Sequence, residues 1–279
     1  MVLKQSYIKQ IVDFVKKEPR TVQDISRLIK KSWLTTDSYV KQIKERTGLI
    51  DIKTFRKGTQ GALKIVFYNY SDSLVTDDVK ESVYNKIRSA RRKTDFDFME
   101  VFQFIPEEKK KAFIEKYEDK LEAKKLSLSS LFNQATSNIY CFSGNLSFIN
   151  TKEKDVKVVS MIEELVKRKI MIKVLCRVDI ASTLNINKLQ TLMMKYPGFI
   201  EIKHCYQPLR GLIIDDKIAR FKDEEQIRLY KKEELSENIR IFYEIYDSEW
   251  ILWLQKVFWN LFRSSIDCNT RLKEIKKIF

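Results

Sequence analysis

The side chains with the clearest chemical potential in this chain are basic and lie near its N-terminus. Residues 1–94 hold 21 lysines and arginines against 10 acidic residues, a net charge of +11, whereas residues 95–279 carry only +4. Within this basic region, Arg56 and Lys57 precede the stretch KGTQG, whose glycines permit tight-turn dihedrals. Such a local excess of positive charge predicts a polyanionic partner, either a nucleic acid or an anionic membrane surface.

Groups that commonly catalyse reactions or bind metals are scarce. His204 is the single histidine, and Cys141, Cys176, Cys205 and Cys268 show no CxxC spacing. These residues cannot complete a zinc site of the usual spacing. We therefore expect reduced core cysteines, a structural histidine, no metal and no cofactor.

The apolar segments do not predict a membrane protein. Lys4, Lys9 and Asp13 interrupt the N-terminal region, which argues against a signal peptide or anchor. The predicted helix SEWILWLQKVFWNLF is apolar nearly all round, but it is short and contains Gln255 and Lys256. We expect a cytoplasmic protein with no membrane partner, in which this helix is buried between a sheet and a second subunit.

Three predicted helices precede the basic turn. Apolar residues recur every three or four positions in QSYIKQIVDFVKKEP and VQDISRLIKK; a third helix, TTDSYVKQIKERTG, has Thr35 or Thr36 as its N-cap and ends at Gly48. With Val40 and Ile43 facing inward, the outward side chains of the third helix are Thr35, Ser38, Lys41, Gln42 and Glu45. The segments LIDIKTFR and ALKIVFYNY alternate apolar residues and predict two strands joined by the turn.

This order of three helices, strand, basic loop and strand resembles a winged helix-turn-helix domain over residues 1–70. The resemblance implies that the third helix lies in the DNA major groove and that the hairpin, or wing, touches the backbone or minor groove. The DNA-binding residues implied are Thr35, Ser38, Lys41 and Gln42 on the helix and Arg56 and Lys57 on the wing. Two alternatives stay open: a winged helix that contacts only proteins, and a basic face that is merely solvated.

Residues 71–127 are expected to form a helical connector. Its first helix ends in a basic cluster that extends the basic surface, formed by Arg88, Arg91, Arg92 and Lys93. Val79, Val83 and Ile87 are four residues apart, a narrow seam typical of pairing with a partner helix, which favours a dimer linker. The stretch PEEKKKAFIEKYEDKLEAKK, with Pro106 at its start and mixed charges after it, predicts an exposed helix.

Residues 128–279 alternate strand and helix patterns. NIYCFSGN, IMIKVLC, FIEIKHC, RGLIID, KIARF and NIRIFYEIY predict strands, and DVKVVSMIEELVKRK and NINKLQTLMMKY predict helices. This order predicts an α/β sandwich.

The stretch QPLRGLIIDDKIARF resembles the HxKxxxxD motif of the phospholipase D superfamily. Asp215 matches the acid of the motif, while Arg210 stands at the lysine position and Pro208 at the histidine position. The superfamily needs one histidine as nucleophile and a second as general acid. Proline cannot attack phosphorus, Arg210 stays protonated, and His204 has the wrong spacing. The resemblance therefore implies a catalytically dead relative and no enzymatic activity.

A winged helix followed by a degenerate phospholipase D-like domain resembles archaeal transcription regulators of the TrmB type, over residues 1–70 and about 130–265. The resemblance implies a C-terminal domain that dimerises and can sense a small molecule. If a ligand pocket exists, it should lie at the carboxyl ends of the strands. The candidate ligand-binding residues are Ser143, Asn145, Arg177, Arg210 and Asp215, with Asp179 beside them.

Two arginines at that edge favour an anionic or hydroxyl-rich effector. The alternative is a structural ion pair of Arg210 with Asp215 or Asp179. The function predicted from the whole sequence is a homodimeric, sequence-specific regulator of transcription that binds double-stranded DNA. The alternatives are a phosphodiesterase or nuclease that uses unconventional residues, and a protein-interaction module.

Overall fold

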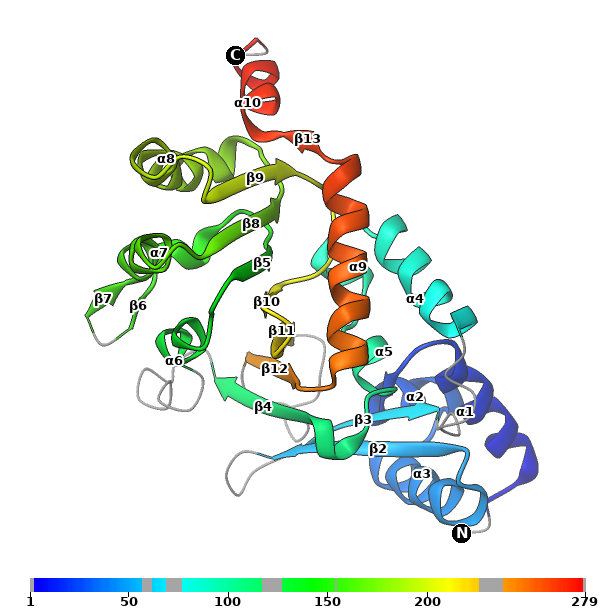
Figure 1. Cartoon of the computed structure of the whole chain (residues 1–279). Coiled ribbons are helices and arrows are strands. Elements are labelled where there is room, and N and C mark those ends of the chain that lie inside the picture. The colour runs from blue at the N-terminus through cyan, green and yellow to red at the C-terminus, as the bar shows by residue number, and fades with distance from the viewer. Residues whose placement is uncertain are drawn as a thin grey trace.

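The computed structural model describes residues 3–56, 62–68, 77–116, 127–153, 155–225 and 238–277 (Figure 1). A small unit of three helices and a short sheet lies beside a large mixed sheet that carries helices on both faces. The expected mixed fold class, α+β at the N-terminus and α/β after it, is confirmed.

The N-terminal unit has the element order and strand pairing of a winged helix-turn-helix. Its elements are α1 (Gln5–Lys17), β1 (Arg20–Thr21), α2 (Val22–Ile29), α3 (Trp33–Thr47), β2 (Ile50–Arg56) and β3 (Ala62–Tyr68). The strands form an antiparallel sheet in the order β1-β3-β2. The hairpin β2–β3 is the expected wing. Lys57 and the expected turn at residues 58–61 lie outside the described residues.

Hydrogen bonds at the helix ends show why these helices begin and end where they do. Thr21 and Asp24 form a capping box at the start of α2. Ser32 caps α3, because its side chain accepts a hydrogen bond from the Thr35 amide. The expected N-cap at Thr35 or Thr36 is therefore wrong. The end at Gly48 is confirmed, and this residue adopts a left-handed conformation that glycine accommodates easily.

The connector contains one long helix and one strand. Its elements are α4 (Asp77–Ser89), η2 (Lys93–Asp95), α5 (Met99–Phe102), η3 (Glu107–Lys109) and β4 (Lys110–Lys116). The expected exposed helix after Pro106 is wrong over residues 110–116, because β4 pairs along its length with β12 (Ile239–Ile245) at the edge of the large sheet. Ala112 and Ile114 pack against the core, and this pairing overrides the helix propensity of the Lys and Glu residues.

The large sheet has the strand order β13-β9-β8-β5-β10-β11-β12-β4. Besides β4 and β12, its strands are β5 (Asn138–Phe142), β8 (Met171–Cys176), β9 (Ile200–His204), β10 (Gly211–Ile214), β11 (Ile218–Glu225) and β13 (Ile266–Asp267). The central strands β5, β8 and β9 are parallel, and the other pairings are antiparallel. The strands and helices expected after residue 128 are present.

Helices cover both faces of this sheet (Figure 1). The remaining elements are α6 (Leu128–Asn133), η4 (Ser147–Asn150), β6 (Lys152–Glu153), β7 (Val156–Lys157), α7 (Val158–Lys167), α8 (Ile180–Lys195), α9 (Ser248–Ser264) and α10 (Cys268–Lys276). One core lies between the sheet and α7 and α8, and a second lies between the sheet and α9, α4 and α5. None of the described helices is long and apolar enough to cross a membrane.

The second of these cores also includes the wing. Phe55, Leu63, Ile65 and Phe67 of the hairpin belong to the same buried cluster as Tyr243 of β12. Lys53 of β2 forms an ion pair with Glu107 beside β4. The hairpin β2–β3 and the large sheet therefore share a hydrophobic core, while the helices α1, α2 and α3 pack around a core of their own.

The apolar seam of α4 is buried within the chain. Val83 and Ile87 are buried in the shared core, and Val79 packs against it. Lys80 forms an ion pair with Glu249 of α9. The seam is therefore covered by the chain's own residues, so the expected pairing with a partner helix through this seam is wrong. A homodimer through another surface stays a prediction.

The aromatic helix α9 is likewise covered largely within the chain. Trp250, Leu254 and Phe258 are buried in the shared core with α4 and α5. Leu252 remains half exposed on its outer side. The expected burial of this helix is confirmed, and the chain's own helices supply much of the cover that was expected from a second subunit.

Candidate nucleic-acid interface

The outer face of α3 presents hydroxyl, amide and ammonium groups side by side. Ser38 and Lys41 are exposed and Gln42 is half buried. The Gln42 side-chain amide donates to the Ser38 hydroxyl at 3.2 Å. Thr35 is also half buried, and its hydroxyl is hydrogen bonded to that of Ser32 at 2.8 Å. The structure therefore brings Ser38, Lys41 and Gln42 together, while Thr35 supports the start of the helix.

A buried carboxylate fixes the orientation of this face. Asp37 forms ion pairs with Lys64 of β3 at 2.5 Å and with Lys41 at 2.9 Å. The Lys64 ammonium also lies 5.0 Å from the centre of the Trp33 ring, a cation–π contact. Burial raises the pKa of Asp37, but the hydrogen bonds and charges of Lys64 and Lys41 outweigh it and leave the pKa below its ordinary value. Asp37 therefore holds the first half of α3 against the wing.

A second ion pair joins the other half of α3 to the wing. Lys44 pairs with Asp51 of β2. Arg56 is the last residue of β2, but its side chain lies outside the described part of the chain, as does Lys57. The predicted phosphate contacts of the wing therefore stay predictions.

Leu34 is a surface residue of α3 that the sequence analysis missed. Its side chain is 76% exposed in the first turn of the helix, on the face that carries Ser38 and Lys41. An apolar side chain in a major groove can contact the methyl group of thymine. The sequence feature that could have identified Leu34 is Ser32, because a serine can cap a helix. With Ser32 as the N-cap, the helix starts before Leu34 and this residue belongs to its first turn.

A second polar site lies at the carboxyl ends of β5 and β8. The Arg177 amide donates to the Gly144 carbonyl at 2.7 Å, and the Arg177 guanidinium pairs with Asp179 at 2.6 Å. The Ser143 hydroxyl accepts the Leu146 amide. Asn145 is tied to α8, because its carbonyl accepts from the Asn185 side chain at 2.8 Å. The structure thus brings together Ser143, Asn145, Arg177 and Asp179 as expected.

Arg210 is partly buried in the same site. Its Nη1 donates to the carbonyls of Gln207 and Leu209, at 3.2 and 2.7 Å. Its guanidinium packs on Gly144 so closely that a Cβ there would lie 2.8 Å from Nη2. Burial, followed by the charge of Arg177, lowers the pKa of Arg210. No described carboxylate forms an ion pair with Arg210, so the alternative of a structural ion pair with Asp215 or Asp179 is wrong.

Asp215 lies at the opposite end of β10 from Arg210. Because β10 runs antiparallel to β5, Gly211 pairs with Phe142 at one end and Ile214 with Ile139 at the other. The Asp215 carboxylate accepts five hydrogen bonds, from the amides and hydroxyls of Thr136 and Ser137 and from the Asn138 amide. Its expected place in the ligand site is therefore wrong.

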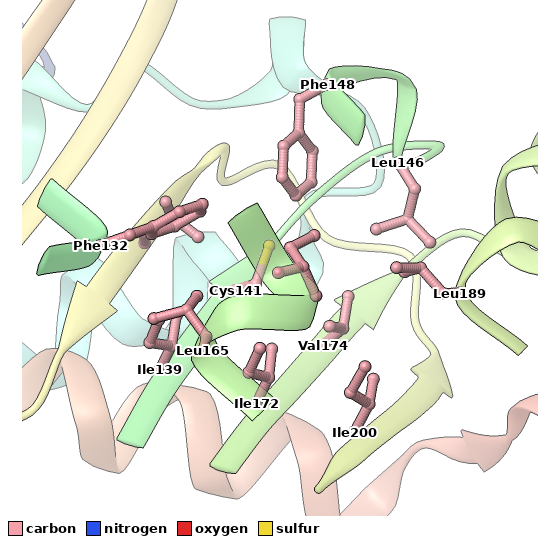
Figure 2. A pocket seen from close by; sticks show the side chains of 12 residues that line it. Phe132, Ile139, Cys141, Leu146, Phe148, Leu165, Ile172, Val174, Leu189 and Ile200 are labelled. Atoms are coloured by element: carbon pink, nitrogen blue, oxygen red, sulfur yellow. The ribbon is translucent and has the colours of Figure 1, made fainter. Parts of the chain in front are cut away.

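The remaining candidate ligands have structural roles. His204 is buried, and its Nδ1 accepts the Val178 amide at 2.9 Å, which confirms the structural role expected for it. No group of three metal-ligating side chains occurs among the described residues. A cavity of about 20 Å³ lies between the sheet and the helices α7 and α8. Figure 2 shows the apolar side chains that line it, among them Cys141 and Leu189. A cavity of that volume has room for about one water-sized probe, so it is too small for an effector.

No protein-family model matches the sequence, and no curated protein matches it. Solved structures with a similar arrangement include TrmBL2, described as an archaeal chromatin protein with a novel mode of DNA binding. It has a TM-score of 0.40 and 13% identity, over 95% of this chain and 94% of that chain. Nuc, a phospholipase D family member from Salmonella typhimurium, has a TM-score of 0.40 and 10% identity, over 57% of this chain and 97% of that chain.

NucT from Helicobacter pylori has a TM-score of 0.38 and 17% identity, over 57% of this chain and 99% of that chain. TM-scores this low give no basis for transferring a function. The function of this chain must therefore be argued from its own residues.

Proposed function

We propose that this chain is a sequence-specific DNA-binding regulator of transcription in which α3 lies in the major groove. The observation that carries the proposal is the outer face of α3, where Ser38, Lys41 and Gln42 lie together on a basic winged helix. Gln reads adenine through its amide, Lys reads guanine through N7 and O6, and the serine hydroxyl accepts or donates to either. Phosphate contacts by the wing and neighbouring lysines would supply affinity without sequence information.

The proposal predicts that α3 carries the sequence preference. A duplex ligand is first selected from a pool of random sequences with the full chain. The double variant Lys41→Ala, Gln42→Ala should then bind the selected duplex about 100-fold more weakly, because each good base contact contributes about 1 to 3 kcal/mol. Its binding to a scrambled duplex should be nearly unchanged. A separate variant, Leu34→Ala, should relax the preference for thymine within the motif. Equal affinity and preference in the double variant and the wild type would show that the groove assignment is wrong.

A homodimer that binds a roughly palindromic motif is part of the proposal, since two-fold protein symmetry is mirrored in the operator. The large sheet would carry the dimer contacts and the effector site. An effector would act only through different affinities for DNA-competent and DNA-incompetent arrangements. The core shared by the wing and the large sheet supports such coupling.

The proposed effector is a small anionic or hydroxyl-rich molecule bound at the carboxyl ends of β5 and β8. Arg210 favours an anionic ligand, because its guanidinium is partly buried and forms no ion pair with an acidic residue in the described part of the chain. Gln207 is 2% exposed, and its side-chain oxygen lacks a donor among the described residues, which suits a ligand hydroxyl. Arg177, Ser143 and Asn145 would complete the site.

Thermal unfolding with a panel of phosphates, dicarboxylates and sugars tests this site. A compound that binds this site, at a free concentration of 100 times its Kd, should stabilise the folded chain by about 2.7 kcal/mol and raise its Tm. Arg210→Ala should abolish this shift in Tm. Lys217→Ala, an exposed change at the opposite end of β10, is the matched control. An unchanged Tm with every compound, or an equal shift in Arg210→Ala, would contradict the effector site.

The observations give no support to a phosphodiesterase. Pro208 and Arg210 occupy the positions of the nucleophile and lysine of the resembled motif, and Asp215 is engaged at the far end of β10. We therefore propose that the chain is not an enzyme. A protein-interaction module would bind little duplex DNA and show shallow salt dependence.

A further inference from the structure

Three arginines at the end of α4 form a charged surface separate from α3 and the wing. Arg88 lies in the last turn of α4, and Arg91 and Arg92 lie in the turn that follows. All three residues are exposed. They come from the connector, outside the helix and hairpin to which DNA contacts are assigned above.

The lysines of the same segment are all neutralised, whereas the arginines are not. The ion pairs of these lysines are Lys80–Glu249, Lys86–Glu100 and Lys93–Glu224. Arg88, Arg91 and Arg92 form no ion pair with any acidic residue in the described part of the chain. The segment therefore exposes three arginines that form no ion pair within the described part of the chain.

The turn that carries two of these arginines is held in place by its own acid. The Asp95 carboxylate accepts the backbone amides of Arg91 and Arg92 at 3.0 and 2.9 Å. Those two hydrogen bonds lower the pKa of Asp95, which is therefore charged at neutral pH. Asp95 adds one negative charge to a segment with three arginines, so these four residues keep a net positive charge.

A contact with α1 brings two further lysines beside α4. The Lys86 ammonium donates to the Lys17 carbonyl at 3.0 Å, which places the last turn of α1 against α4. That turn contributes the exposed residues Lys16 and Lys17. Two positive charges from a distant part of the sequence thus lie beside α4.

Guanidinium groups suit partners that carry oxyanions. Their planar donors match two oxygens of a phosphate or a carboxylate, and they stay charged at any physiological pH. Duplex DNA offers a regular row of such phosphates, with a negative charge about every 1.7 Å of its axis. We propose that Arg88, Arg91 and Arg92 bind DNA phosphates outside the motif that α3 reads, as a second and sequence-independent contact. DNA as the partner rests on the proposed function.

The test compares two variants that lose the same charge. One is Arg88→Ala, Arg91→Ala and Arg92→Ala; the matched control is Lys273→Ala, Lys276→Ala and Lys277→Ala on the exposed face of α10. Binding of the full chain to an unselected duplex of about 45 base pairs, more than four helical turns, is titrated with salt. The arginine variant should reduce the slope of log K against log salt by about 2 to 3, at 0.9 for each lost phosphate contact, and lower affinity at least about tenfold.

The same variants separate this surface from the α3 site. The arginine variant should keep the wild-type ratio of affinities for selected and scrambled duplex, and the control should keep both slope and affinity. An arginine variant that matches the control would overturn the inference while the proposed function stands. Loss of binding to anionic vesicles or RNA, with DNA binding unchanged, would also overturn it. A wild-type chain that binds no duplex would refute the proposed function and this inference together.

Discussion

Asp215→Ala is expected to lower the free energy of unfolding by about 3 kcal/mol, the upper part of the usual range for one substitution, because it removes the centre of a hydrogen-bond network. The carboxylate accepts from Thr136, Ser137 and Asn138 at 2.7 to 2.9 Å. Asp215 also has a φ of 49°, and its own carbonyl accepts from the Gln255 side chain of α9. One side chain thus ties β10 to the start of β5, and its backbone carbonyl to α9. Urea unfolding monitored by fluorescence measures the change.

Asp216→Ala is the matched control for this prediction. Asp216 is the exposed neighbour, so the variant loses the same charge and should stay within about 0.5 kcal/mol of wild type. Asp215→Asn keeps the size of the side chain and the backbone conformation, so an intermediate loss is expected. Equal unfolding midpoints for Asp215→Ala and Asp216→Ala would mean that the carboxylate does not organise this end of the sheet.

Asp37→Ala should also cost about 3 kcal/mol, because it leaves Lys64 as an unpaired buried charge. Lys64 is 8% exposed, and Asp37 is the acidic residue with which it forms an ion pair in the described structure. Adding Lys64→Met removes that charge and should restore most of the stability. Glu45→Ala, an exposed change on the same helix, is the control. A double variant as unstable as Asp37→Ala alone would contradict this account.

The contributions of Asp37 and Asp215 to the free energy of unfolding should depend on pH in the same direction. Burial raises the pKa of Asp37 and of Asp215, but hydrogen bonds outweigh it and hold both values below that of an unfolded aspartate, far below for Asp215. A carboxyl group whose folded pKa is depressed stabilises the fold above its unfolded pKa, about 3.9, and loses that contribution as pH falls through the folded value. Unfolding free energy should therefore fall below about pH 4, and less steeply in Asp215→Ala.

Hydrophobic periodicity was enough to predict most elements but not the pairing of β4. The patterns over 138–142, 171–176 and 200–204 predict β5, β8 and β9 because their apolar runs are short and bounded by turns. In residues 110–116, the sequence KKAFIEK, with charged residues on both sides of a short apolar run, also fits a solvated helix. Only the partner strand β12, more than 120 residues later, selects the strand. The pairing of two strands so far apart in the sequence cannot be predicted from the local pattern of either one.

The candidate sites were predictable where they follow from one element. The helical period brings Ser38, Lys41 and Gln42 to one face, and the parallel strands bring Arg177 and Ser143 to one edge. Asp215 was misplaced because its distance from Arg210 depends on which way β10 runs beside β5. The seam of α4 was misassigned because a narrow apolar stripe fits a second chain and the chain's own core equally well.

Sequence-specific binding is the central claim, and a competition measurement tests it most directly. The wild-type chain is bound to its selected duplex and to a scrambled duplex of the same composition, and each complex is titrated with salt. We predict a steep fall of affinity with salt for both duplexes and a preference of at least about 1,000-fold for the selected one near physiological salt. Equal affinity for the two duplexes would leave a non-specific nucleic-acid-binding protein, and weak, salt-insensitive binding to both would contradict the account.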